Sequence, residues 1–162
     1  MKIAILSDSH DNWTNLTQAI QLSNDAACSM LLFAGDLMAP GKGISTLKTF
    51  AGQVHMVFGN NDGDIYKIMA LTQWTNIHVH GAIYQDIVDG IRIMMNHYPN
   101  IVTWAAKSGD FDMCIYGHDH RYHEEMIENA LLVNPWSILG DAEPASFVIY
   151  DTQTKSVAKI LL

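Results

Sequence analysis

Residues 2–10 of the chain read KIAILSDSH, and this stretch decides what fold to expect. The apolar run from Ile3 to Leu6 is short, continuous and bounded by polar residues. A run of this kind favours a β-strand that is covered on both faces. Asp8 and His10 follow this run within four residues. The sequence therefore predicts a buried first strand whose end carries two polar side chains that can bind a metal ion.

Similar apolar runs recur along the chain and alternate with segments of helical periodicity. The apolar spacing predicts helices over residues 13–27, 44–50, 64–73 and 99–107, and strands over 2–7, 30–34, 54–58, 76–79, 82–88, 91–96 and 113–116. This alternation predicts parallel pairing with right-handed crossovers. The last third is typical of an antiparallel meander, with strands over 123–128, 130–133, 146–151 and 156–161. The pattern indicates an α/β fold, and with no linker or repeat visible we expect a single domain over 1–162.

Composition narrows the classes of function. The 162 residues include 9 Lys and Arg against 17 Asp and Glu, for a formal charge of -8, so a basic footprint for nucleic acid is absent. No apolar stretch approaches the roughly 18 residues of a membrane-spanning helix, so no membrane partner is expected. Cys28 and Cys114 stand alone, which is typical of reduced, buried thiols in a cytoplasmic protein. Eight histidines in an acidic chain raise the question of a metal.

Five of the predicted strands end in polar side chains that can bind a metal ion. The segments are Asp8-Ser9-His10, Gly35-Asp36, Gly59-Asn60-Asn61-Asp62, Asn96-His97 and Gly117-His118-Asp119-His120. In open α/β sheets, ligands bind in the crevice beyond the carboxyl ends of the strands. Residues two apart in an extended segment point the same way, so His118 and His120 can face one point. We therefore expect these loops to converge.

The converging loops offer seven nitrogen and oxygen donors. They are Asp8, His10, Asp36, Asn60, His97, His118 and His120. One metal ion takes four to six ligands, so seven donors suit two ions that share a bridging carboxylate. Imidazole, carboxylate and carboxamide groups without thiolate favour Mn²⁺, Zn²⁺, Fe or Ni²⁺ over Ca²⁺. Each segment alone is also ordinary turn chemistry, and the prediction depends on their joint occurrence at strand ends.

In this order the motifs resemble those of the calcineurin-like metallophosphoesterase superfamily, and the chain length resembles its small YfcE-type phosphodiesterase branch. The resemblance implies a metallophosphoesterase-type β-sandwich of two mixed sheets flanked by helices, with a dinuclear site at one end. It also implies two divalent metal ions per chain, with Mn²⁺ expected first and Zn²⁺, Ni²⁺ or Fe as alternatives. It assigns Asp8, His10 and His120 to the first ion, Asn60, His97 and His118 to the second, and Asp36 to both.

The function implied by this resemblance is a metal-dependent phosphodiesterase or phosphoesterase that hydrolyses small phosphodiesters or phosphomonoesters. Two ions would bind phosphate oxygens and lower the pKa of a bridging water, whose hydroxide attacks phosphorus. The alternative is a protein-interaction scaffold like Vps29 with vestigial metal binding. A nuclease is disfavoured because the sequence has no basic groove. The sequence does not identify the physiological substrate, and it does not determine whether the chain forms a homo-oligomer.

The sequence departs from the family pattern at two positions. Asn61 stands where many members have a His that contacts phosphate and protonates the leaving group. Asn61 can donate a hydrogen bond to substrate but cannot donate a proton at pH 7. With Asn61 at this catalytic position, activated esters should be hydrolysed better than esters with poor leaving groups. Tyr98 stands where Gly often follows the metal-binding His, and its ring is expected either to line the substrate crevice or to join the core.

The remaining histidines lie within predicted strands or at their ends. They are His55, His78, His80 and His123. We interpret all four as structural or surface residues, with His123 close enough to the metal loops to be a candidate for orienting a ligand.

Overall fold

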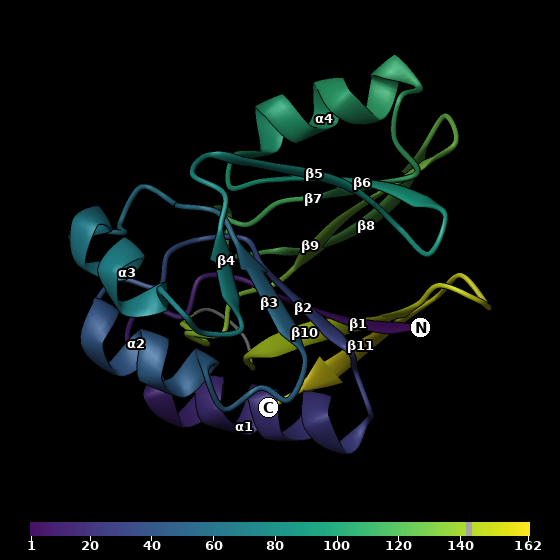
Figure 1. Cartoon of the computed structure of the whole chain (residues 1–162). Helices are drawn as coiled ribbons and strands as arrows, with labels where there is room; N and C mark the ends of the chain where they lie inside the picture. Colours follow the sequence, from purple (N-terminus) through teal and green to yellow (C-terminus); the bar gives the residue numbers. More distant parts are fainter. Residues whose placement is uncertain (142–143) are drawn as a thin grey trace.

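The computed structural model describes residues 1–141 and 144–162, which form a sandwich of two mixed sheets flanked by helices (Figure 1). The six-stranded sheet contains, in spatial order, β11 (Ser156–Leu161), β10 (Ser146–Asp151), β1 (Lys2–Leu6), β2 (Met30–Phe33), β3 (Gln53–Met56) and β4 (Ile77–Val79). The five-stranded sheet contains β5 (Ile83–Val88), β6 (Ile91–Asn96), β7 (Met113–Ile115), β9 (Ala130–Pro135) and β8 (Tyr122–Ile127). This arrangement confirms the expected fold class.

Helices cover the outer face of each sheet. The described residues form α1 (Trp13–Asp25), α2 (Pro40–Leu47), α3 (Ile65–Thr72) and α4 (Pro99–Ser108). The first three lie against the six-stranded sheet, and α4 lies against the five-stranded sheet (Figure 1). The helix starts follow the sequence signals, since the side chains of Asn12 and Asp64 cap α1 and α3 by accepting from backbone N–H groups.

The first strand is buried on both faces, as its apolar run predicts. Ile3 and Ile5 point into the core between the two sheets, whereas Ala4 and Leu6 point toward the helices. All four side chains are fully buried. Cys28 and Cys114 are also buried, in agreement with the expectation for lone thiols.

Two expectations from the sequence are wrong. The second helix spans Pro40–Leu47 and not 44–50, because Pro40 has the φ that a first helical turn requires. The C-terminal strands form two hairpins in different sheets and not one meander. Apolar alternation identifies a strand but does not encode which sheet it joins.

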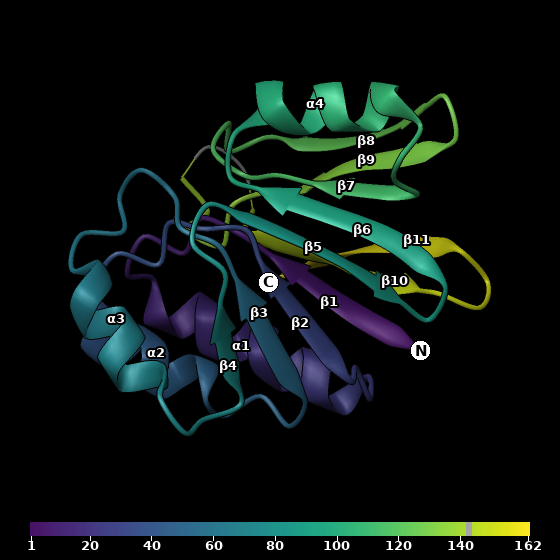
Figure 2. The ribbon, with the colours of Figure 1, turned by 45° about the horizontal axis from the view of Figure 1, so that its top comes forward.

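The strand directions place the candidate site. β1, β2 and β3 run parallel in one sheet, and β6 and β7 run parallel in the other. The loops that follow these five strands gather at one end of the sandwich (Figure 2). The predicted donors therefore come from both sheets.

Candidate metal centre

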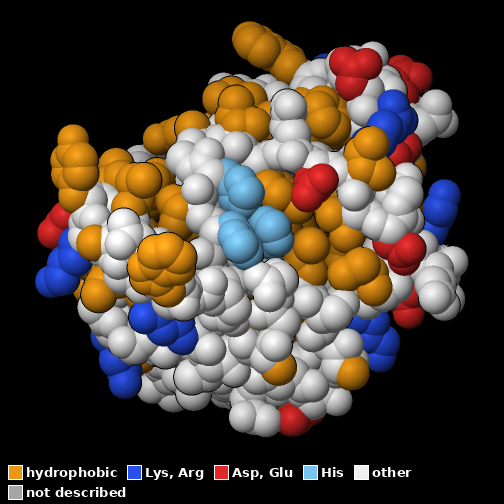
Figure 3. Space-filling model, viewed as in Figure 1, with side chains coloured by type: hydrophobic (Ala, Val, Ile, Leu, Met, Phe, Trp, Pro, Cys, Tyr) orange, Lys and Arg blue, Asp and Glu red, His pale blue; other side chains and the backbone are white. Residues whose placement is uncertain are grey.

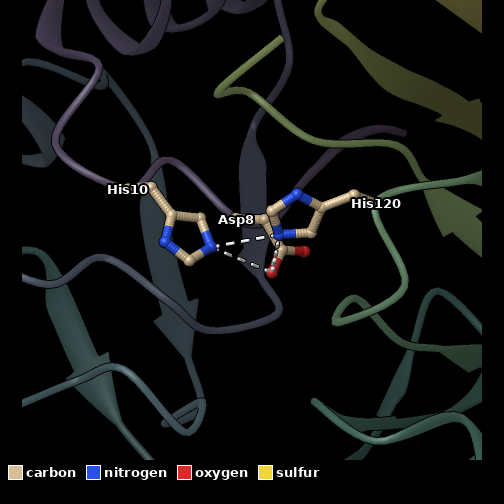
Figure 4. Close-up of side chains that lie close together, drawn as sticks. All are labelled: Asp8, His10 and His120. Carbon is tan, nitrogen blue, oxygen red and sulfur yellow. Dashed lines mark hydrogen bonds and ion pairs between the residues drawn. The ribbon is translucent and has the colours of Figure 1, made fainter. Parts of the chain in front are cut away.

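The first part of the site joins the loops after β1 and β7 (Figure 4). His10 Nε2 lies 3.1 Å from His120 Nε2. Asp8 Oδ1 lies 3.7 Å from His10 Nε2 and 3.4 Å from His120 Nε2. Asp8 and His10 are two positions apart, and His120 lies 110 positions beyond His10, yet the three residues bring one ligand atom each close together.

The second part of the site joins Asp36 and Asn60 to histidines that follow strands of the five-stranded sheet. Asp36 Oδ2 lies 3.4 Å from His10 Nε2 and 3.4 Å from His97 Nε2. Asn60 Oδ1 lies 3.1 Å from His97 Nε2 and 2.9 Å from His118 Nδ1. All seven sequence-predicted donors thus lie in one continuous cluster, with Asp36 between its two halves.

The rings of His97 and His120 are oriented by contacts of their Nδ1 atoms. His97 Nδ1 is 2.8 Å from the Ala34 carbonyl oxygen, so an Nδ1–H that donates there leaves Nε2 as a lone pair facing the cluster. His120 Nδ1 is 2.9 Å from Asp141 Oδ2. Such partners fix the tautomer of metal-binding histidines and raise their basicity. Sequence reasoning missed Asp141, which follows no predicted strand and belongs to none of the recognised motifs.

The backbone at the site adopts an unusual conformation. Asp8, His10, Asp36, His118 and His120 all have positive φ, between 40° and 73°. This left-handed conformation costs non-glycine residues roughly 1–2 kcal/mol each, and it persists where the surroundings impose it. Here the loops are hydrogen-bonded to one another, for example from Asp8 N–H to the Gly35 carbonyl oxygen at 3.0 Å. Such strain is typical of functional sites.

Glycines make room for the buried carboxylates. A Cβ on Gly59 would collide with the Asp36 carboxylate, and a Cβ on Gly117 would collide with Ser7 and Asp8. These two positions therefore require glycine for reasons of space.

Asp62 holds the loops after β2 and β3 together. Its side chain, in a residue only 7% exposed, accepts hydrogen bonds from the backbone N–H groups of Asp36, Leu37, Met38 and Gly59 at 2.8–3.0 Å. Burial raises the pKa of this carboxyl, and the four N–H donors oppose the rise by stabilising the carboxylate. Asp62 thus positions Asp36.

Carboxylates and imidazoles at the site shift one another's pKa. Burial opposes ionisation of Asp8, but His10 and His120 hold its pKa well below the ordinary value. Burial likewise opposes ionisation of Asp36, whose pKa is lowered by His97 and Asn61. The contact with Asp8 raises the pKa of His120 to about 9 against the effect of burial, and Asp141 adds to the rise. The buried carboxylates therefore favour positive charge at this point.

The donor set fits divalent metal ions. Two groups of three ligand atoms lie within 4.8 Å of one another, namely Asp8, His10 and His120, and Asp8, Asp36 and His97. Imidazole nitrogens mixed with carboxylate oxygens suit first-row transition metals and Zn²⁺ better than Ca²⁺, which prefers oxygen alone.

The two predicted substrate-contacting residues border this cluster. Asn61 donates from its backbone N–H to Asp36 Oδ1 and from Nδ2 to Asp36 Oδ2, both at 2.8 Å. Tyr98 is 40% exposed, so it does not belong to the core, and its ring meets those of His97 and His118 edge to face. His123 contacts Tyr116 at 2.8 Å between Nδ1 and the hydroxyl oxygen.

An open cavity of about 660 Å³ adjoins the cluster. It is lined by His118, Asp119, His120, Arg121, Tyr122, Trp136 and Asp141. Two predicted metal ligands therefore form part of its wall, and the cavity gives a small molecule access to them.

The sequence matches the profile of the calcineurin-like phosphoesterase superfamily domain over residues 1–155. The chain belongs to this superfamily. Within it, the chain is 29% identical over 172 residues to a phosphodiesterase of Methanocaldococcus jannaschii, an alignment that covers all of this chain and 99% of the relative. The solved structure described as a novel archaeal phosphodiesterase superposes with a TM-score of 0.91 at 27% identity, with both chains fully covered.

More distant phosphoesterase-fold structures share the architecture. YfcE from E. coli matches with a TM-score of 0.74 at 20% identity, and the match covers 99% of each chain. Vps29 of Entamoeba histolytica, solved in complex with Zn²⁺, matches with a TM-score of 0.67 at 15% identity over 100% of this chain and 98% of that chain. At these identities the matches confirm the fold, which is the one that the motifs predicted.

Proposed function

We propose that this phosphoesterase is a metal-dependent phosphodiesterase that hydrolyses small phosphodiesters or phosphomonoesters at a centre of two divalent ions. The observation that carries the proposal is the position of Asp36, whose Oδ2 lies 3.4 Å from imidazole nitrogens in both halves of the cluster. A carboxylate placed between two sets of donors is suited to bridge two ions. The relative named a phosphodiesterase supports the same reading.

We assign Asp8, His10 and His120 to the first ion, Asn60, His97 and His118 to the second, and Asp36 to both. Mn²⁺ is the metal we expect, with Zn²⁺, Ni²⁺ and Fe as alternatives. When bound, the ions would neutralise phosphate charge and acidify a water molecule. They would also make one end of a chain of formal charge -8 attractive to a small anion.

The residues around the ligands would hold the substrate. Asn61 Nδ2, which donates to Asp36 Oδ2, would donate to a phosphate oxygen beside that carboxylate. The half-exposed Tyr98 ring would flank an ester group next to His97 and His118. In the part of the chain that the structure describes, no helix is long and apolar enough to cross a membrane. A cytoplasmic location and a homo-oligomeric state stay predictions.

Hydrolysis of bis-p-nitrophenyl phosphate with Mn²⁺, Zn²⁺, Ni²⁺ or Fe²⁺ tests the proposal. Turnover that requires one of these ions and is removed by a chelator would support the enzyme. The alternative, a Vps29-like scaffold with vestigial metal binding, is favoured by the shared fold and by Asn61 in place of the family His. It predicts that the chain binds ions without turnover, so inactivity with every ion would favour it.

The Asn61 side chain should make the enzyme selective for good leaving groups. An amide cannot protonate the departing oxygen, and general acid catalysis contributes about 10²–10⁴-fold to such steps. We therefore expect aryl phosphodiesters to react much faster than alkyl ones, and Asn61→His to raise the alkyl rate more than the aryl rate. Measured kcat/KM values for both ester types check this, and equal metal-dependent rates in the native chain would contradict it.

Replacing Asp141 by Asn should weaken metal binding without unfolding the chain. The variant loses the carboxylate that orients His120 through Nδ1, and the loss of such a partner costs about 10–100-fold in metal affinity. Competition with a fluorescent chelator measures the affinity. Asp119→Asn is a matched control, because Asp119 also lines the cavity while its carboxylate orients none of the predicted ligands among the described residues. Equal affinities in both variants would refute the role of Asp141.

A further inference from the structure

Three histidines outside the candidate metal centre gather on one face of the molecule. His55 on β3 is paired in register with His78 on β4, and His80 follows two residues later on the same face. Figure 3 shows a patch of histidine side chains on this surface, over β3 and β4. We call these residues the β3–β4 histidine cluster.

The rings in this cluster make close contacts. His55 Nδ1 lies 3.0 Å from His80 Nε2. The ring of His78 stacks on that of His55, with centroids 5.0 Å apart, and its Nε2 is held 2.8 Å from Gln53 Oε1. His55 and His80 therefore point ring nitrogens at each other, while His78 is held by a different partner.

Two residues on β5 of the five-stranded sheet, Tyr84 and Asp86, lie beside the histidine cluster. The buried ring of Tyr84 on β5 contacts both His55 and His80, with centroids 5.0 and 4.7 Å apart. Its hydroxyl donates to Asp86 Oδ2 at 3.4 Å. The Asp86 carboxylate favours positive charge on both imidazoles. The cluster thus combines two facing nitrogens with a nearby anion.

His55 and His80, whose ring nitrogens face each other, favour the neutral form. Burial, reinforced by the neighbouring His80 and His78, lowers the pKa of His55 to about 4. Burial and His78 also lower the pKa of His80. Neutral imidazole is the form that binds a metal ion, so the pair does not have to lose a charge near pH 7.

We propose that His55 Nδ1 and His80 Nε2 bind one divalent transition-metal ion, Zn²⁺, Ni²⁺ or Cu²⁺, at a site separate from the candidate metal centre. Two imidazole nitrogens on one tetrahedral Zn²⁺ lie about 3.3 Å apart, and the observed separation is 3.0 Å. The facing pair His10 and His120 shows a similar 3.1 Å. The proton between His55 and His80 moves to the other nitrogen of its own ring, so both facing lone pairs become available.

Binding there would fix an edge of the sandwich. β4 is a three-residue edge strand, and His55 and His80 connect β3 to the end of β4. A ligand that binds only the folded chain stabilises it by mass action. We therefore expect this ion to hold β4 against β3 and to raise the thermal stability of the chain.

Counting bound Zn²⁺ by equilibrium dialysis at pH 7.5 tests the proposal. The native chain is compared with His55→Gln, His80→Gln and the control His123→Gln, whose imidazole contacts Tyr116 away from the cluster. We expect His55→Gln and His80→Gln each to bind one ion fewer than the native chain, and His123→Gln to bind the same number. An equal count in all four proteins would overturn the proposal.

Thermal unfolding supplies a second readout and controls for misfolding. The Tm in EDTA shows whether each variant folds, and the exposed His80 is the substitution expected to be tolerated best. Saturating Zn²⁺ should raise the Tm of the native chain more than that of His80→Gln. Equal rises would contradict the proposal. Phosphodiester hydrolysis should stay within about twofold of native in His80→Gln, which separates this site from the proposed function.

Discussion

Hydrolysis of bis-p-nitrophenyl phosphate should fall by at least about 10³-fold in Asp36→Asn. The substitution replaces the carboxylate that lies 3.4 Å from imidazole nitrogens in both halves of the site by a neutral amide. An amide cannot offer two anionic oxygens to two cations, so both the charge and the bridge are lost. Initial rates at saturating Mn²⁺ measure the effect.

Asp112→Asn is the matched control for this prediction. Asp112 is paired with Arg92 through a 2.8 Å contact, and it is not one of the seven predicted ligands. Its substitution should leave the rate within about twofold of native, and the Tm in EDTA should show that Asp36→Asn still folds. A folded Asp36→Asn variant with native activity would exclude the proposed bridging role.

The largest loss of stability should come from Asp62→Ala. The buried carboxylate accepts four backbone N–H groups from the loops after β2 and β3, and its removal leaves those donors without their partner. Unsatisfied buried donors and lost charge-assisted hydrogen bonds each cost about 1–3 kcal/mol. We expect the free energy of unfolding to fall by about 3 kcal/mol or more, measured by urea denaturation in EDTA.

Asp64→Ala provides the comparison, two residues further along the chain. Asp64 caps α3 by accepting from the Lys67 N–H, and the loss of such a cap costs about 1 kcal/mol. A much larger effect at Asp62 would show that the carboxylate stabilises the loops after β2 and β3. Similar losses in the two variants would mean that Asp62 contributes no more than a helix cap.

The convergence of the seven candidate donors could be predicted because their placement follows from strand direction. Asp8, Asp36 and Asn60 follow parallel strands of one sheet, and the carboxyl ends of parallel strands meet at one edge. His97 and the pair on the loop after β7 follow parallel strands of the other sheet. Local patterns sufficed here, since each candidate donor lies within five residues of the end of the strand that positions it.

Other features could not be predicted because they depend on contacts between distant segments. The left-handed backbone at Asp8 and Asp36 is imposed by hydrogen bonds from neighbouring loops. Asp141 reaches His120 from a segment without a motif. The β3–β4 histidine cluster depends on the register of His55 with His78, so the sequence alone indicated only structural or surface histidines. Spacing within a segment contains no information about such pairings.

The origin of the donors in both sheets has a kinetic consequence. Asp36 follows a strand of the six-stranded sheet, and His97 follows a strand of the five-stranded sheet. An ion coordinated by both, as we propose, would keep the sheets from separating until a ligand bond breaks. We therefore expect a metal-loaded molecule to unfold more slowly than its equilibrium stability alone would give.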